Sequence, residues 1–315
     1  MDTDNDSTLP PRSERRQRQK KPKLQIGHFI IALAVVALIG GIGVYSYHVY
    51  YTSTTDYRVE QAFRFVDRAD EKLTKIDAII NSEVSEDTAK EVDAALKSIE
   101  PTRDLLRQAA DFIKRAQANA GADEKEYLTN IQESIALRGQ MLGLAPELLN
   151  VTQQSAKALK GATKGWNKLT AATKAATAAT KAFDKEDKAG MLESVKKNND
   201  ALTALAEARV EFNDATRVLE GLAFDAYLSY IDLREQMAQS AISAANSWAS
   251  NDKTALKVDL ERYEKLRTQA AAMEDNELVT PEAIIANAYQ QLVGAQNAEY
   301  LDIREQVLTL DKKVR

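Results

Sequence analysis

The stretch DYRVEQAFRFVDRADEKLTKIDAII, residues 56–80, decides the fold class. Its apolar residues recur at alternating steps of three and four, which places them on one face of a helix. Heptad spacing of this kind is typical of a helix that packs against a partner helix. The residues of this face are Val59, Ala62, Val66, Ala69, Leu73, Ile76 and Ile80. The stretch therefore predicts a helix of a bundle rather than a strand.

The next segment, 86–119, continues the heptad pattern past a proline. Its apolar face comprises Ala89, Val92, Leu96, Ile99, Leu106, Ala110 and Ile113, and only Arg103 misses its place. Because the register survives Pro101, we expect one kinked helix rather than two. The whole chain has 12 glycines and six prolines in 315 residues, which are too few for an all-β domain of this size.

Short polar turns divide the chain after residue 56 into about six expected helices. The turns 85–89, 183–187 and 250–255 place side-chain oxygens where the first N–H groups of a helix need acceptors. Thr280-Pro281 fits an N-cap followed by the first helical position. We expect an all-α fold, an elongated antiparallel helical bundle with heptad packing. The expected helices are 56–83, 86–119, 122–183, 186–249, 252–275 and 281–313, the fourth bent at Gly221.

Two eight-residue segments echo each other. YIDLREQM at 230–237 and YLDIREQV at 300–307 share five identical residues, and the other three are apolar exchanges. Each lies in phase with the heptads of its helix. These heptads run through Phe212, Leu219, Ala223, Ala226, Tyr230, Leu233 and Met237, and through Tyr289, Val293, Tyr300, Ile303, Val307 and Leu310. We interpret the echo as duplicated α-hairpins that share one packing geometry, and a docking motif is the alternative.

An uncharged segment, 24–51, precedes the helical part. With its flanks, the apolar centre 29–44 reaches the roughly 20 residues needed to cross a bilayer core of about 30 Å. Tyr45, Tyr47, Tyr50 and Tyr51 follow at once, as in an interfacial aromatic belt. A cleaved signal peptide is the alternative, but no small-x-small site follows the apolar centre. We therefore expect an uncleaved, single-pass transmembrane signal anchor.

The charges on the two sides of this segment predict its orientation. Seven basic residues precede it: Arg12, Arg15, Arg16, Arg18, Lys20, Lys21 and Lys23. The positive-inside rule places the tail 1–23, expected to be disordered, in the cytoplasm and the domain 52–315 outside the cell membrane. The tail also holds four acidic residues, so its net charge of +3 leaves −8 for the domain in a chain of −5. The basic residues either set the topology alone or also contact anionic lipid of the inner leaflet.

The lack of reactive side chains restricts the chemistry of the domain. The chain has no cysteine, and its two histidines, His28 and His48, both flank the apolar centre of the uncharged segment. Zinc and di-iron sites of helical bundles use histidine or cysteine, and nucleophiles usually need a histidine base. The acidic turn 184–187 lacks the oxygen spacing of a calcium loop. We therefore expect no enzyme, no metal and no cofactor.

Lysines form the only candidate contact surface that the sequence suggests. The segment 156–183 contains no acidic residue, although the domain as a whole is acidic. Its lysines are Lys157, Lys160, Lys164, Lys168, Lys174 and Lys181, the first four at helical spacing. They form either a solvated face balanced by acidic residues of the next helix or a contact surface for an anionic polymer.

These features together favour a binding protein over an enzyme. We expect a non-catalytic, membrane-anchored helical scaffold or adaptor of the cell envelope that binds another envelope component. The alternative is a sensory ectodomain that signals through a partner membrane protein, because a tail of 23 residues leaves no room for an effector. No nucleic acid is expected as a partner. The long helices pair either within one chain or across a homodimer.

Overall fold

The computed structural model describes residues 50, 54–85 and 87–315. The chain divides into two units, 1–53 and 54–315. The predicted tail, and the predicted transmembrane segment apart from Tyr50, lie outside the described residues. Among the residues that are described, no helix is long and apolar enough to cross a membrane.

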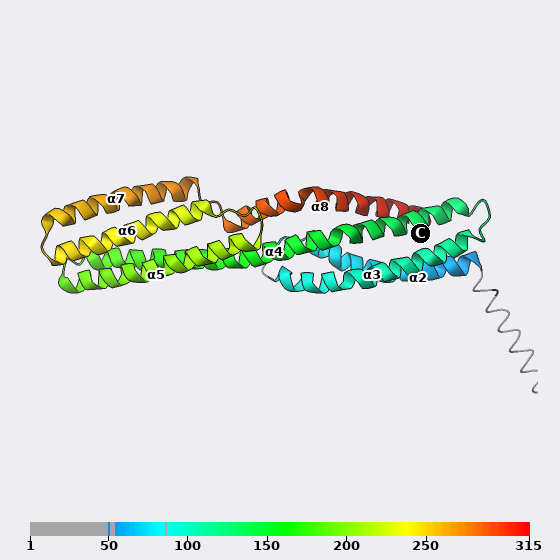
Figure 1. The fold of residues 1–315 in the computed structure, drawn as a ribbon, viewed down its shortest axis with the longest axis horizontal. Helices are drawn as coiled ribbons and strands as arrows, with labels where there is room; N and C mark the ends of the chain where they lie inside the picture. Colours follow the sequence, from blue (N-terminus) through cyan, green and yellow to red (C-terminus); the bar gives the residue numbers. More distant parts are fainter. Residues whose placement is uncertain (1–49, 51–53, 86) are drawn as a thin grey trace, which may run out of the picture. The chain divides into compact units, whose positions relative to one another are not determined.

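The unit 54–315 is all-α in its described part, as predicted (Figure 1). The described ranges contain seven helices and no strand. Consecutive helices among the first six pack as antiparallel neighbours, whereas the last packs on the third helix rather than on the sixth (Figure 1). Their bounds are α2 Thr55–Ile80, α3 Thr88–Gln117, α4 Lys125–Phe183, α5 Lys188–Val218, α6 Asp225–Ala249, α7 Lys253–Asn276 and α8 Pro281–Val314.

One predicted boundary is wrong, because the expected helix 186–249 is two helices. The chain leaves α5 after Val218 and enters α6 at Asp225. Gly221 in this turn has a φ of +74°, a left-handed conformation that glycine adopts without steric cost. Leu222 and Phe224 are buried, whereas Ala223, expected on the apolar face, is exposed. The prediction was wrong here because buried apolar residues of the turn continue the apolar pattern of α5 into α6.

The first core lies among α2, α3, the first half of α4 and the second half of α8 (Figure 1). Six of the seven predicted face residues of α2 are buried, and Val59 is half-buried. The helix α3 continues through Pro101, so the expected single helix is confirmed. Its buried face holds Ala95, Thr102 and Ala109, one residue before each of the predicted Leu96, Arg103 and Ala110. This shift explains why Arg103 failed to fit the pattern.

The second core lies among the rest of α4, α5, α6, α7 and the beginning of α8. Aromatic rings fill its centre, with the ring of Phe212 4.8 Å from that of Tyr227 and 5.0 Å from that of Phe224. A Cβ atom at Gly165 would lie 3.1 Å from the Phe212 ring. The glycine therefore lets α4 and α5 approach closely at this level.

The helix α4 belongs to both cores. It has 59 residues, which corresponds to a length of about 90 Å, and it passes through Pro146 without a break in the helix. Its first half packs on α3 and α8, and its second half packs on α5. The two cores are therefore joined by one continuous helix.

Three of the predicted helix starts are confirmed by their caps. Asp187 Oδ1 accepts the backbone N–H of Gly190 at 2.6 Å, and Asp252 Oδ1 accepts those of Thr254 and Ala255. The Thr280 hydroxyl accepts the N–H of Ala283. These acceptors satisfy N–H groups that have no partner inside the helix.

Candidate functional site

The six lysines of the predicted contact surface all lie exposed on α4. Lys157 Nζ donates to Gln153 Oε1 of the same helix at 2.9 Å. Lys160, Lys174 and Lys181 occupy equivalent heptad positions, because whole multiples of seven residues separate them. Lys168 departs from these positions toward α5, where its Nζ lies 2.6 Å from Glu207 Oε2.

Two acidic residues of the next helix, which could have balanced these charges, pair with other lysines instead. Glu193 of α5 pairs with Lys185, and Asp200 pairs with Lys197. Only Lys168 forms the expected bridge, and the hydrogen bond from its Nζ to Glu207 raises the pKa of Lys168. Within residues 54–85 and 87–315 the remaining lysines of the face form no ion pair. The face therefore keeps most of its positive charge.

A buried arginine, which the sequence analysis did not identify, lies in the first core. The side chain of Arg138 on α4 is 3% exposed and binds two carboxylates. Its Nε and Nη2 donate to Asp70 of α2 at 2.6 and 2.9 Å, and its Nη1 and Nη2 donate to Asp311 of α8 at 3.1 and 2.6 Å. Burial opposes the charged form of Asp311, but hydrogen bonds from Arg138 and Ser134 lower its pKa overall.

This ion network extends to the last residue of the chain. Arg315 also pairs with Asp67 at 2.9 Å and with Asp70 at 3.4 Å. The helices α2, α4 and α8, far apart in sequence, are thereby held together by charge. No sequence pattern distinguished Arg138 from a surface arginine, since its partners lie 68 and 173 residues away.

The repeated segments supply a tyrosine and an arginine to each core. In α6, Arg234 Nη1 donates to Tyr230 OH at 3.0 Å, and Tyr230 OH donates to Glu274 of α7 at 3.0 Å. In α8, Arg304 Nε lies 3.2 Å from Asp77 of α2, and the buried hydroxyl of Tyr300 has no hydrogen-bond partner among the described residues. Each copy therefore pairs with an acidic residue of a neighbouring helix, which favours a packing role for the echo.

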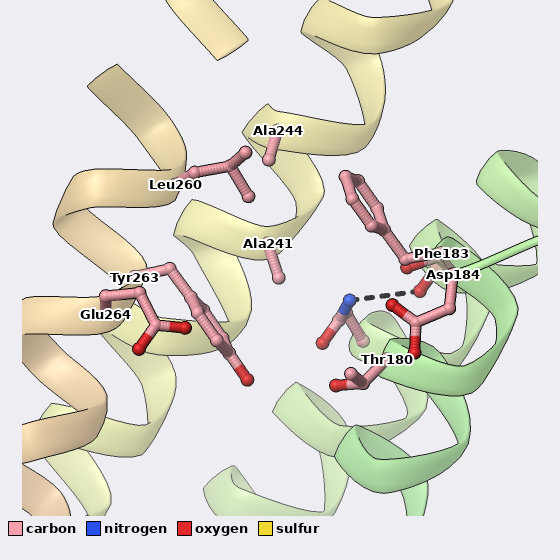
Figure 2. A pocket seen from close by; sticks show the side chains of 10 residues that line it. Thr180, Phe183, Asp184, Ala241, Ala244, Leu260, Tyr263 and Glu264 are labelled. Atoms are coloured by element: carbon pink, nitrogen blue, oxygen red, sulfur yellow. Dashed lines mark hydrogen bonds between the residues drawn. The ribbon is translucent and has the colours of Figure 1, made fainter. Parts of the chain in front are cut away.

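A cavity of about 170 Å³ lies among α4, α5, α6 and α7 (Figure 2). All four helices contribute to the lining, and Asp184 directly follows α4. The lining residues are Thr180, Phe183, Asp184, Ser194, Asn198, Ala241, Ala244, Leu260, Tyr263 and Glu264. Figure 2 shows Tyr263 pointing from α7 toward Thr180 and Asp184. The lining combines two aromatic rings, two carboxylates and a buried amide, the mixture of apolar surface and a few polar groups that is typical of small-molecule sites.

Comparison with known proteins adds no assignment to these sites. No protein-family model matches the chain, and no curated protein and no solved structure matches it either. In the described part of the chain, no group of three or more acidic or histidine side chains is placed to hold a metal ion.

Proposed function

We propose that this chain is a non-catalytic helical adaptor, anchored in the cell membrane by the segment 24–51, whose domain binds another component of the envelope. The observation that carries the proposal is α4, which takes part in both cores. A helix of about 90 Å offers long lateral faces for contact rather than one deep catalytic cleft. The duplicated hairpins expected from the repeated segments belong to the same proposal.

The membrane anchor and its orientation are supported by the sequence. The segment 24–51 has no charged residue, and seven basic residues precede it. Positive charge of this kind stays on the cytoplasmic side. The domain then faces outward, where the absence of cysteine means that it needs no disulfide in an oxidising compartment.

The lysine face of α4 is the contact surface that this proposal favours. Its charges are exposed, and within the described part of the chain only Lys168 is neutralised by a neighbouring helix. Exposed charges are screened over about 8 Å at physiological salt, so binding to an anionic polymer should weaken steeply as salt is added. Lys160, Lys164, Lys174 and Lys181 are the residues to test, since none of them forms an ion pair among the described residues.

A charge-matched pair of variants tests this surface. In the first, Lys160, Lys164, Lys174 and Lys181 are replaced by glutamine. In the control, the exposed Lys90, Lys97, Lys114 and Lys125 are replaced in the same way. The full chain in mild detergent is applied to dextran sulfate and to neutral dextran. We expect salt-sensitive binding to dextran sulfate that the first variant loses and the control keeps. Equal loss in both variants would reduce the effect to net charge and remove the surface from the proposal.

The sensory alternative has one observation in its favour, the cavity among α4, α5, α6 and α7. Cross-linking in intact cells and purification in mild detergent separate the two functions. An adaptor should retain an envelope component that has no cytoplasmic effector. A sensor should retain a membrane protein that carries one. Recovery of the chain alone after cross-linking would contradict both.

A further inference from the structure

The cavity of about 170 Å³ owes its existence to the way in which α7 packs. The helix α6 contacts both α5 and α7, whereas α7 packs on α6 rather than on α4 or α5. Only Leu266 and Ala270 of α7 are buried. Where α6 faces the gap it presents Ala241 and Ala244, side chains too short to fill the space between α7 and the α4–α5 pair.

Hydrogen-bonding groups on the cavity wall are left without protein partners. Asn198 is 3% exposed, and its Nδ2 donates to the Ser194 carbonyl oxygen at 3.1 Å. Its Oδ1 accepts no hydrogen bond from the described residues, and neither does the hydroxyl of Tyr263 form one there. Both residues line the cavity, so their oxygens remain able to accept a hydrogen bond from a donor ligand that enters it.

The charge of the lining selects the class of that ligand. Asp184 and Glu264 are the charged residues of the wall, and no lysine, arginine or histidine is among the lining residues. Glu264 also pairs with Arg267 at 2.8 Å, whereas Asp184 forms no ion pair within the described ranges. The rings of Phe183 and Tyr263 add faces that attract cations. Carboxylate, amide oxygen and aromatic face all favour a donor that carries positive charge.

We propose that this cavity binds a small organic amine in its protonated form, with the ammonium at Asp184 and Asn198 and an apolar body against Phe183, Ala241 and Leu260. The volume is below the usual range of about 300–1,000 Å³ for ligand pockets, so a single ring with a short arm is the largest body that fits. The inference does not rest on the adaptor proposal, and it would supply the sensory alternative with its ligand.

Three probes of similar size and different charge test the proposal. Benzylamine, benzyl alcohol and benzoate are titrated separately into the full chain in mild detergent, at neutral pH, with calorimetric detection. We expect benzylamine to bind at least tenfold more tightly than either of the other two. Equal affinity for benzylamine and benzyl alcohol, tighter binding of benzoate, or no binding of benzylamine would each overturn the proposal.

Two variants and a control then locate the binding. Ala241→Leu fills the cavity and should weaken benzylamine binding at least tenfold, while Ala249→Leu makes the same exchange at an exposed position of α6 and should leave it unchanged. Asp184→Asn keeps the volume, removes the charge and should also weaken binding about tenfold, so a misfolded Ala241→Leu protein does not prevent a decision. Benzylamine binding that survives Asp184→Asn would place the amine elsewhere and refute the site.

Discussion

Replacement of Arg138 by methionine should destabilise the first core strongly. Methionine keeps the unbranched stem of arginine but loses the guanidinium that joins α4 to Asp70 and Asp311. The two carboxylates would then keep only the half-exposed Arg315, at 3.4 Å from Asp70 and 3.8 Å from Asp311, as a counter-charge among the described residues. The cost therefore arises mainly from the carboxylates that remain, and much less from the packing of the side chain that is removed.

The geometry of the network gives the magnitude. Removal of one partner from a buried ion pair costs about 3–5 kcal/mol. Asp70 and Asp311 keep 31% and 20% of their side-chain surface exposed, so water stabilises part of the charge that is left. We therefore expect a loss of about 3 kcal/mol, the lower end of that range. If the cost lies in the carboxylates that remain, adding Asp70→Asn and Asp311→Asn to Arg138→Met should restore more than half of it.

Urea unfolding of the full chain in mild detergent, followed by circular dichroism at 222 nm, measures the loss. The matched control is Arg107→Met, since Arg107 is 68% exposed and pairs only with Asp104 three residues before it. A surface pair of this kind contributes about 0–1 kcal/mol. The two tryptophans, Trp166 and Trp248, lie in the second half of α4 and in α6, so their fluorescence follows the second core separately.

The pH dependence provides an independent check on the network. The pKa of Asp311 is lowered in the folded protein from its ordinary value of 3.8. Its contribution to stability is therefore fully present above pH 3.8 and is lost as the pH falls through the lower folded value. The difference between wild type and Arg138→Met should shrink over that acidic range. A variant as stable as wild type at neutral pH, or a difference that does not change with acid, would refute the reasoning.

Two further predictions concern the repeated segments and the turn that the sequence missed. Tyr300→Phe should leave the midpoint of urea unfolding unchanged or raise it, because the hydroxyl that is removed has no partner in the described structure. Tyr230→Phe should cost about 1 kcal/mol of unfolding free energy, because its hydroxyl bonds to Glu274 and Arg234. Equal effects of the two changes would contradict this difference. Gly221→Ala should destabilise the fold by about 1–2 kcal/mol and so lower the melting temperature. The φ of +74° is unfavourable for alanine, and no atom lies within 4 Å of the added Cβ, so backbone strain is the cause. An unchanged melting temperature would show that the turn relaxes.

Local periodicity in the sequence was sufficient for the helical class and for most of the helix bounds. A helix turns by about 100° per residue, so the apolar face of α2 could be identified from spacing alone, and the cap residues Asp187, Asp252 and Thr280 marked where helices begin. The same periodicity failed between α5 and α6. Buried loop residues such as Leu222 and Phe224 are as apolar as helix residues, and only the backbone conformation at Gly221 distinguishes them.

Which side chains meet was decided by the tertiary structure alone. Arg138 resembles any helix arginine until α2 and α8 bring Asp70 and Asp311 to it, and Lys168 differs from Lys164 only because α5 places Glu207 beside it. The cavity among α4, α5, α6 and α7 likewise exists because α7 packs on α6 and not on α4 or α5. Sequence spacing describes one helix at a time, whereas charge pairing and empty volume are properties of several helices packed together.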